Sequence, residues 1–227
     1  MIKIENVEVV GWEHAIRGMR NPLNSWDKSD SALCKRDYGD CNVDTACGCP
    51  KNGEFDEDYY CIGKNDLDLM KRLAAAGSDH SKYRRMIVVY ATITSSLYWW
   101  KEYDTYKVGT VANSCSTMHK IHAKEFTLDD FSHEHLLNEW YFTTLNIIID
   151  ALNMAREQYL ETKDKRYWWQ MIQLLPSSYN QKRTVMLNYE VLANMYRSRR
   201  NHKLDEWREF CEWVETLPYS ELITGGK

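Results

Sequence analysis

Five basic side chains lie within seven residues near the C-terminal end of the sequence, and together they could bind an anion. They are Arg197, Arg199, Arg200, His202 and Lys203. Guanidinium groups present fixed pairs of N–H donors that match the oxygens of a phosphate or a carboxylate. A plainer explanation also holds, because basic side chains at a helix end satisfy its last carbonyl groups and complement its dipole. The sequence therefore predicts either an anion clamp or a solvated basic turn here.

A second polar concentration begins at Tyr98 and ends near His119. Its first part, residues 98–106, is dense in aromatic side chains, which are more often core than binding platform. Polar residues that could contact a ligand interleave with the aromatics or follow them: Asp104, Lys107, Asn113, Ser114 and Ser116. No helical or strand period explains the stretch, and an irregular polar segment after a buried strand suits a ligand pocket.

Cysteines and histidines raise the question of a metal site. Five cysteines fall in or beside one loop: Cys34, Cys41, Cys47, Cys49 and Cys61. A zinc clip is one interpretation, but Cys47 and Cys49 have a single residue between them, whereas a usual zinc knuckle has at least two. The pairs His119 with His122 and His133 with His135 each lack the third ligand that zinc needs. We therefore expect reduced thiols and no metal site.

Hydrophobic periodicity predicts the elements that must position these residues. Apolar runs indicate strands near residues 2–10, 83–94 and 182–187. Helices are expected at 12–19, from Asn65 or Asp66 as cap towards Gly77, at 134–161 as the longest helix, and at 167–175, 188–198 and 204–217. The predicted fold is α+β, with a small mixed or antiparallel sheet packed against the long central helix and several shorter helices.

Length and composition bound the organisation of the chain. Its 227 residues, with 44% hydrophobic and 27% charged, predict a single domain over 1–227 with a Cys-rich loop insertion at about 21–63. A formal charge of −4 argues against binding a nucleic-acid polymer. No apolar stretch approaches a membrane span, and the residues after Met1 do not follow a signal-peptide pattern. We expect a cytoplasmic protein.

Taken in order, four segments make the chain resemble the flavin-dependent thymidylate synthase family. Gly77, His80, Ser81 and Tyr83 are similar to the family's Gly-His-x-x-x-Phe-Glu-His element before a buried strand. The segment from Asn113 to His119 lies where the family has N-E-x-S-x-R-Y, with Asn113 and Ser116 identical. Two later segments also match in order: Leu174, Leu175, Pro176, Thr184, Leu187 and Asn188, then Arg199, His202, Lys203, Leu204, Glu206 and Arg208.

This resemblance implies a homotetramer that holds FAD and methylates dUMP, with methylenetetrahydrofolate as the carbon donor and NADPH as the hydride donor. By position, it implies that Arg199 faces the nucleotide as the catalytic residue. It also implies a substrate-binding set of Ser116, Ser114, Arg197 and Lys107, and a cofactor-binding set of His80, Asn113 and His202. Positioning and electrostatics would carry the chemistry, because the flavin and the folate are the reactive parts.

The chain also departs from the family pattern. The family's R-H-R has no counterpart, since Asp104, Thr105, Tyr106 and Lys107 occupy that neighbourhood, and Ser114 and Met118 replace its glutamate and last arginine. Each lost arginine removes charge-assisted donors of about 1.5 to 3 kcal/mol. Either Lys107 and Arg197 substitute, or the substrate is bound differently. Two alternatives stay open: a nucleotide-binding relative with changed or lost activity, and a helical interaction protein with a zinc-clipped loop.

Overall fold

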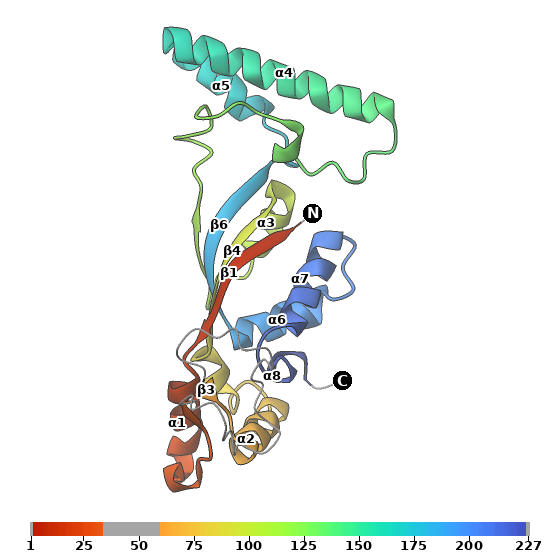
Figure 1. The fold of residues 1–227 in the computed structure, drawn as a ribbon. Helices are drawn as coiled ribbons and strands as arrows, with labels where there is room; N and C mark the ends of the chain where they lie inside the picture. The colour runs from red at the N-terminus through yellow and green to blue at the C-terminus, as the bar shows by residue number, and fades with distance from the viewer. Residues whose placement is uncertain (1, 34–59, 226–227) are drawn as a thin grey trace, which may run out of the picture.

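The computed structural model describes residues 2–33 and 60–225 and shows an elongated molecule with a central sheet (Figure 1). In chain order the elements are β1 (Lys3–Val10), α1 (Trp12–Arg20), η1 (Asn21–Leu23), η2 (Trp26–Lys28), β2 (Ala32–Leu33), β3 (Tyr60–Cys61), α2 (Lys64–Ala75), η3 (Lys82–Arg85), β4 (Val88–Ser96), α3 (Leu97–Tyr103), β5 (Val111–Ser114), η4 (Leu128–Asp130), α4 (Glu139–Thr162), α5 (Lys165–Leu174), β6 (Asn180–Asn188), α6 (Tyr189–Arg199), α7 (Asp205–Glu215) and α8 (Glu221–Thr224). Within these ranges no helix is long and apolar enough to span a bilayer.

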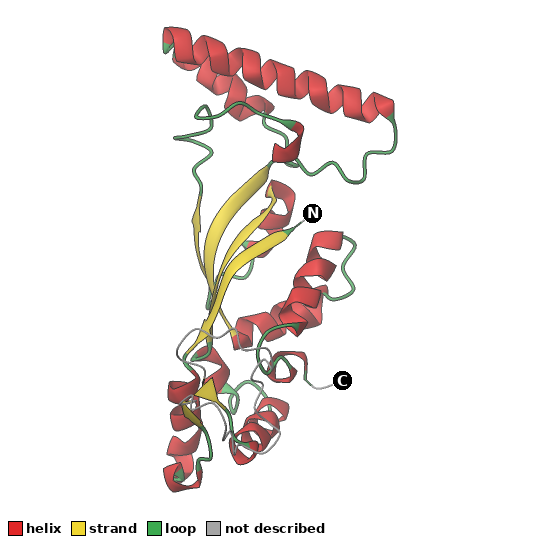
Figure 2. Cartoon of the chain, in the orientation of Figure 1, coloured by secondary structure: helices red, strands yellow, loops and turns green. Residues whose placement is uncertain are grey.

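The α+β class and the small sheet are confirmed. Four strands pair antiparallel in the order β1-β4-β6-β5. Figure 2 shows the sheet in yellow in the middle of the molecule. β4 and β6 pair along their whole length, from Val88 opposite Asn188 to Ser96 opposite Asn180. On one face of β4, alternate residues Val89, Ala91 and Ile93 are buried, as period-two patterning requires. Helices α6 and α7 lie on one side of the sheet (Figure 1).

The aromatic segment that shows no period in the sequence is partly helical. Residues 97–103 form α3, which buries Trp99, Trp100 and Tyr103. Its aromatics therefore belong to the core, although the helix is too short to show a clear period. The strand predicted at 83–94 also begins later, because Lys82–Arg85 form the 3-10 helix η3 and the strand starts at Val88.

The long helix does not cover the sheet, contrary to our expectation. α4 packs on α5 in a separate hydrophobic cluster of Ile121, Phe126, Phe131, Leu145, Ile149, Leu152, Ala155 and Met171. The larger cluster combines residues of the sheet with those of α1, α2, α3, α6, α7 and α8. α4 begins at Glu139 rather than at 134, because the side chain of Asn138 caps it by accepting the Trp140 N–H. Figure 1 shows α4 and α5 at one end of the molecule, beyond the sheet.

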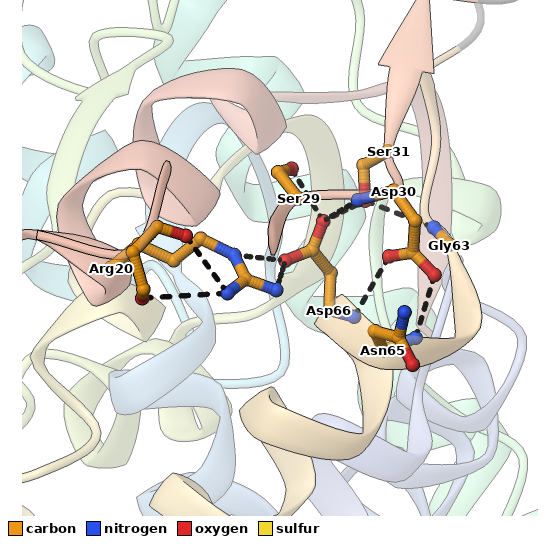
Figure 3. A network of polar contacts seen from close by, with 8 residues as sticks. Arg20, Ser29, Asp30, Ser31, Gly63, Asn65 and Asp66 are labelled. Atoms are coloured by element: carbon orange, nitrogen blue, oxygen red, sulfur yellow. Dashed lines mark hydrogen bonds and ion pairs between the residues drawn. The ribbon is translucent and has the colours of Figure 1, made fainter. Parts of the chain in front are cut away.

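The described ends of the predicted insertion are anchored on α2 by a buried carboxylate (Figure 3). Asp66 is fully buried and pairs with Arg20 at 2.6 Å. Its other oxygen accepts hydrogen bonds from the hydroxyls of Ser29 and Ser31. Asp30 caps α2 by accepting the N–H groups of Asn65 and Asp66, so the cap is neither of the two residues expected. Deleting the predicted insertion from residue 21 onwards would remove Ser29, Asp30 and Ser31, and with them these hydrogen bonds.

Candidate functional site

Arg199 ends α6 and reaches back to α3. Its Nη1 lies 2.6 Å from Oε2 of Glu102, and its Nε donates to the Tyr106 hydroxyl at 3.0 Å. The guanidinium carbon also lies 4.9 Å from the centre of the Trp207 ring and 5.6 Å from that of Tyr106. Such contacts combine a charge-assisted bond with cation–π attraction and hold the side chain in one orientation.

Glu102 is the hub of this arrangement. The same Oε2 accepts the indole N–H of Trp207 at 3.2 Å and lies 3.3 Å from His202 Nε2. Nδ1 of His202 accepts the Leu204 N–H, so the ring proton is on Nε2 and faces Glu102. One carboxylate therefore orients both Arg199 and His202, two of the residues predicted from the sequence.

An open hollow of about 890 Å³ lies beside this group. Its lining includes Tyr98, Glu102, Arg197, His202 and Lys203. Arg197 and Lys203 are exposed and form no ion pair with any residue that the structure describes. The lining thus combines two unpaired cations, Arg197 and Lys203, with the carboxylate of Glu102. Tyr98, also in the lining, donates to the buried Glu206. The volume of the hollow suits a small organic ligand, and its free cations suit a phosphate.

The polar residues after the buried strand lie at a different place, on the sheet edge formed by β5. Asn113 pairs with Thr184 and Ser114 with Arg183, and all four residues of β5 are exposed. The Ser116 hydroxyl accepts the N–H groups of Met118 and His119, which closes a turn. Over the described ranges no hydrogen bond or ion pair joins this edge to Arg199.

α3 and the residue that follows it, Asp104, link the two groups through different side chains. Asp104 accepts from Arg183 at 2.7 Å, next to Ser114 on the sheet, while Glu102 accepts from Arg199. Arg183 also packs on the Trp100 ring at 4.2 Å. Lys107 is exposed in the turn that follows α3. A single chain therefore assembles Arg197, Arg199, His202 and Lys203, whereas Asn113, Ser114, Ser116 and Lys107 lie outside the hollow.

His80 lies near neither group. It is exposed in the turn between α2 and η3, which leads into the Val88 end of β4, while α3 follows the Ser96 end. The nine residues of β4 span about 30 Å at roughly 3.3 Å per residue. In the part of the chain that the structure describes, no hydrogen bond or ion pair connects the His80 side chain with the basic turn.

The residues that organise the site, namely Glu102, Tyr106 and Trp207, are not among those predicted from the sequence. Glu102 and Tyr106 lie in the aromatic segment that shows no clear period, and Trp207 lies within the helix expected at 204–217. A helix over residues 97–103 places Glu102 on the same short element as the buried Trp99, Trp100 and Tyr103. The link of Glu102 to Arg199, 97 residues away, is not visible in local sequence.

Among the described residues, no group of three or more His, Cys, Asp or Glu side chains converges as a metal site. His122 packs on Tyr159, His133 contacts the Phe131 carbonyl oxygen, and His135 pairs with Asp205. Cys61 and Cys211 are buried, and burial raises the pKa of the Cys211 thiol to about 12. The cysteines at 34, 41, 47 and 49 lie outside the described residues.

The architecture defines a class: a four-stranded antiparallel sheet with helices on one side and a helical pair at its end. This is the fold of the flavin-dependent thymidylate synthases. Two solved structures of thymidylate synthase X from Helicobacter pylori, both with FAD and dUMP, share it. One has a TM-score of 0.65 and 15% identity over 100% of both chains, and the other a TM-score of 0.61 and 16% identity over 97% and 98%. No protein-family model and no curated protein matches the sequence.

Proposed function

We propose that this protein binds FAD and a pyrimidine nucleotide and methylates dUMP, with methylenetetrahydrofolate as carbon donor and NADPH as hydride donor. The observation that carries the proposal is the full-length likeness in fold to a protein bound to FAD and dUMP. Order and spacing of the motifs support it independently, because they match over most of the chain outside the insertion.

The hollow beside the turn between α6 and α7 is the proposed nucleotide site. Arg197 and Lys203 line it as free cations, and they would bind a phosphate group of the nucleotide or of the flavin. Glu102 and His202 also line the hollow, and Glu102 holds Arg199 beside it, so His202 and Arg199 would present fixed donors to the ligand. The flavin, when bound, supplies the redox chemistry, and these side chains bind and orient. His80 lies at the other end of β4 from this hollow, so a neighbouring subunit would have to bring it to the flavin.

We further propose that a complete site needs a second copy of the chain. Asn113, Ser114, Ser116 and Lys107 lie on an edge that does not reach Arg199 within one chain, so a neighbouring subunit would supply them. Homotetramer formation, as the family resemblance implies, would provide that neighbour.

The outer face of α4 supports self-association. Trp140, Ile147 and Met154 are 75%, 62% and 67% exposed and recur every seven residues, which places them in one row along the helix. Monomeric proteins rarely expose such a row, and apolar rows of this kind usually mark an interface. The buried free thiol of Cys211 agrees with the cytoplasm as the proposed compartment.

Visible absorption of the purified protein and a dUMP titration test the proposal. We expect flavin bands, together with dUMP binding that weakens about 10-fold or more in Arg199→Ala and in Arg197→Ala, the usual loss for a charge-assisted bond. Arg72→Ala is the matched control, because Arg72 is exposed on α2 and does not line this hollow. A colourless protein that binds neither FAD nor dUMP would refute the proposal.

A further inference from the structure

A second hollow, separate from the proposed nucleotide site, lies between α2, α6 and α8. Its volume is about 450 Å³, and its lining includes Lys71, Arg84, Tyr196, Arg197, Arg200 and Ile223. It shares only Arg197 with the hollow at the basic turn. We propose that this second hollow binds a small organic phosphate with an apolar body, held by Arg197 and Arg200.

The charges around the hollow do not balance. Lys71 pairs with Glu221 at 3.4 Å, and Arg84 pairs with Glu190 at 3.0 Å. Arg197 and Arg200 form no ion pair with any described residue, so two guanidinium charges remain without a counterion. Clustered like charges attract an anion, and guanidinium groups match phosphate oxygens in pairs.

Arg84 adds a buried guanidinium to the lining. Its side chain is more than nine-tenths buried, yet it lines the hollow. Nη1 donates to the Leu222 carbonyl oxygen at 2.9 Å, and Nε lies 3.0 Å from Oε2 of Glu190. Arg84 is therefore already partnered, and the charge available to an anion comes from Arg197 and Arg200.

The remaining walls determine which kind of anion fits. Ala74 and Ala193 contribute small apolar surfaces, and Tyr196 and Ile223 are largely buried side chains of the hydrophobic core. A site with cations at its mouth and apolar walls selects a ligand that has both a phosphate and an apolar part. Inorganic phosphate alone would leave the apolar wall unused and should bind less tightly.

Phenyl phosphate is the probe for this test, compared with inorganic phosphate by calorimetric titration of the full chain. We expect phenyl phosphate to bind at least fivefold more tightly than inorganic phosphate. Arg200→Ala should weaken phenyl phosphate binding at least 10-fold, while Arg72→Ala, which removes the same charge from α2 outside the hollow, should leave it unchanged. Ala75→Phe, at an exposed lining position, fills the hollow without changing charge and should also abolish binding.

Three results would overturn the inference. In the first, Arg200→Ala and Arg72→Ala weaken phenyl phosphate binding equally. In the second, phenyl phosphate and inorganic phosphate bind with equal affinity. In the third, Ala75→Phe binds phenyl phosphate as tightly as the wild type does. The first two would indicate general surface attraction, and the third a ligand that stays outside the hollow. Because neither Arg200 nor Ala75 lines the hollow at the basic turn, this test can fail while dUMP binding there persists, and the reverse also holds.

Discussion

Glu102 and Arg199 form an ion pair of 2.6 Å that closes the end of α6 onto α3. The carboxylate takes the place at Arg199 that an anionic ligand would otherwise fill. Arg199 is therefore pre-oriented and at the same time partly neutralised. An anionic ligand that binds at this turn must therefore either use Arg197 and Lys203, which form no ion pair with a described residue, or displace Glu102.

Glu102→Gln keeps an acceptor for Arg199 but removes the negative charge. We expect dUMP to bind about 5- to 10-fold more tightly, since an added charge-assisted bond is worth on the order of 1 kcal/mol or more. The free protein should lose about 1 kcal/mol of stability, because the pair is partly exposed. Calorimetric titration measures the first effect and urea unfolding the second. Weaker dUMP binding in this variant would show that Glu102 contacts the ligand directly.

Asp66→Asn should destabilise the protein strongly. It removes the charge that compensates the buried Arg20, and breaking a buried pair by changing one partner costs about 3 to 5 kcal/mol. For a chain of this length we expect the melting temperature to fall by roughly 6 to 12 °C or more. Asp68→Asn, on the exposed face of the same helix, is the control and should change it little. Similar melting temperatures for the two variants would mean that Arg20 finds another partner.

Acid should destabilise the protein through the same carboxyl group. Burial alone would raise the pKa of Asp66, but hydrogen bonds from Ser31, Ser29 and Arg20 outweigh burial and hold the pKa below its ordinary value of 3.8. A carboxyl group with a depressed folded pKa stabilises the fold above its unfolded pKa, and this stabilisation is lost as the pH falls through the folded pKa.

The unfolding free energy of the wild type should therefore fall below pH 3.8 more steeply than that of Asp66→Asn. Urea titrations at a series of pH values from about 6 to about 3 measure the difference between the two proteins, which removes the contribution of all other carboxyl groups. Parallel pH profiles would exclude Asp66 as a source of acid sensitivity.

A charge on the outer row of α4 should prevent assembly. Ile147→Glu places a carboxylate in the middle of the row formed with Trp140 and Met154, and burying it in an interface without a partner is unfavourable by several kcal/mol. Light scattering after size exclusion should then show a monomer at concentrations where the wild type is oligomeric. Asn146→Glu, exposed on a neighbouring face, should not change the mass. A monomeric wild type would contradict the proposed assembly.

Much of the fold was predictable, because it depends on local periodicity. The three longer strands, the helices at both ends of the chain and the α+β class follow from apolar spacing, as at Val89, Ala91 and Ile93. β5 was missed because its four residues are all exposed at an edge and carry no apolar alternation. The prediction that α4 packs against the sheet was wrong, because an apolar stripe shows that one face of a helix is covered but not which element covers it.

The site was only half predictable, for a related reason. A run of basic residues is visible in sequence, so Arg197, Arg199, His202 and Lys203 could be grouped from their spacing alone. Their carboxylate partner could not, because Glu102 meets Arg199 through tertiary packing across 97 positions. The placement of Asn113 and Ser116 opposite the basic turn was inferred from family resemblance. It stays a prediction for the assembled protein.

The separate packing of α4 and α5 has a consequence for the cooperativity of unfolding. Among the described residues this helical pair shares no buried residue with the sheet cluster, so it can open while the strands stay paired, as a unit of lower local stability. The proposed interface would then be carried by a part of the chain that opens before the sheet does. Association would slow amide exchange in α4 and α5 before it altered exchange in β4 and β6. Formation of the oligomer would therefore also increase the local order of this helical pair.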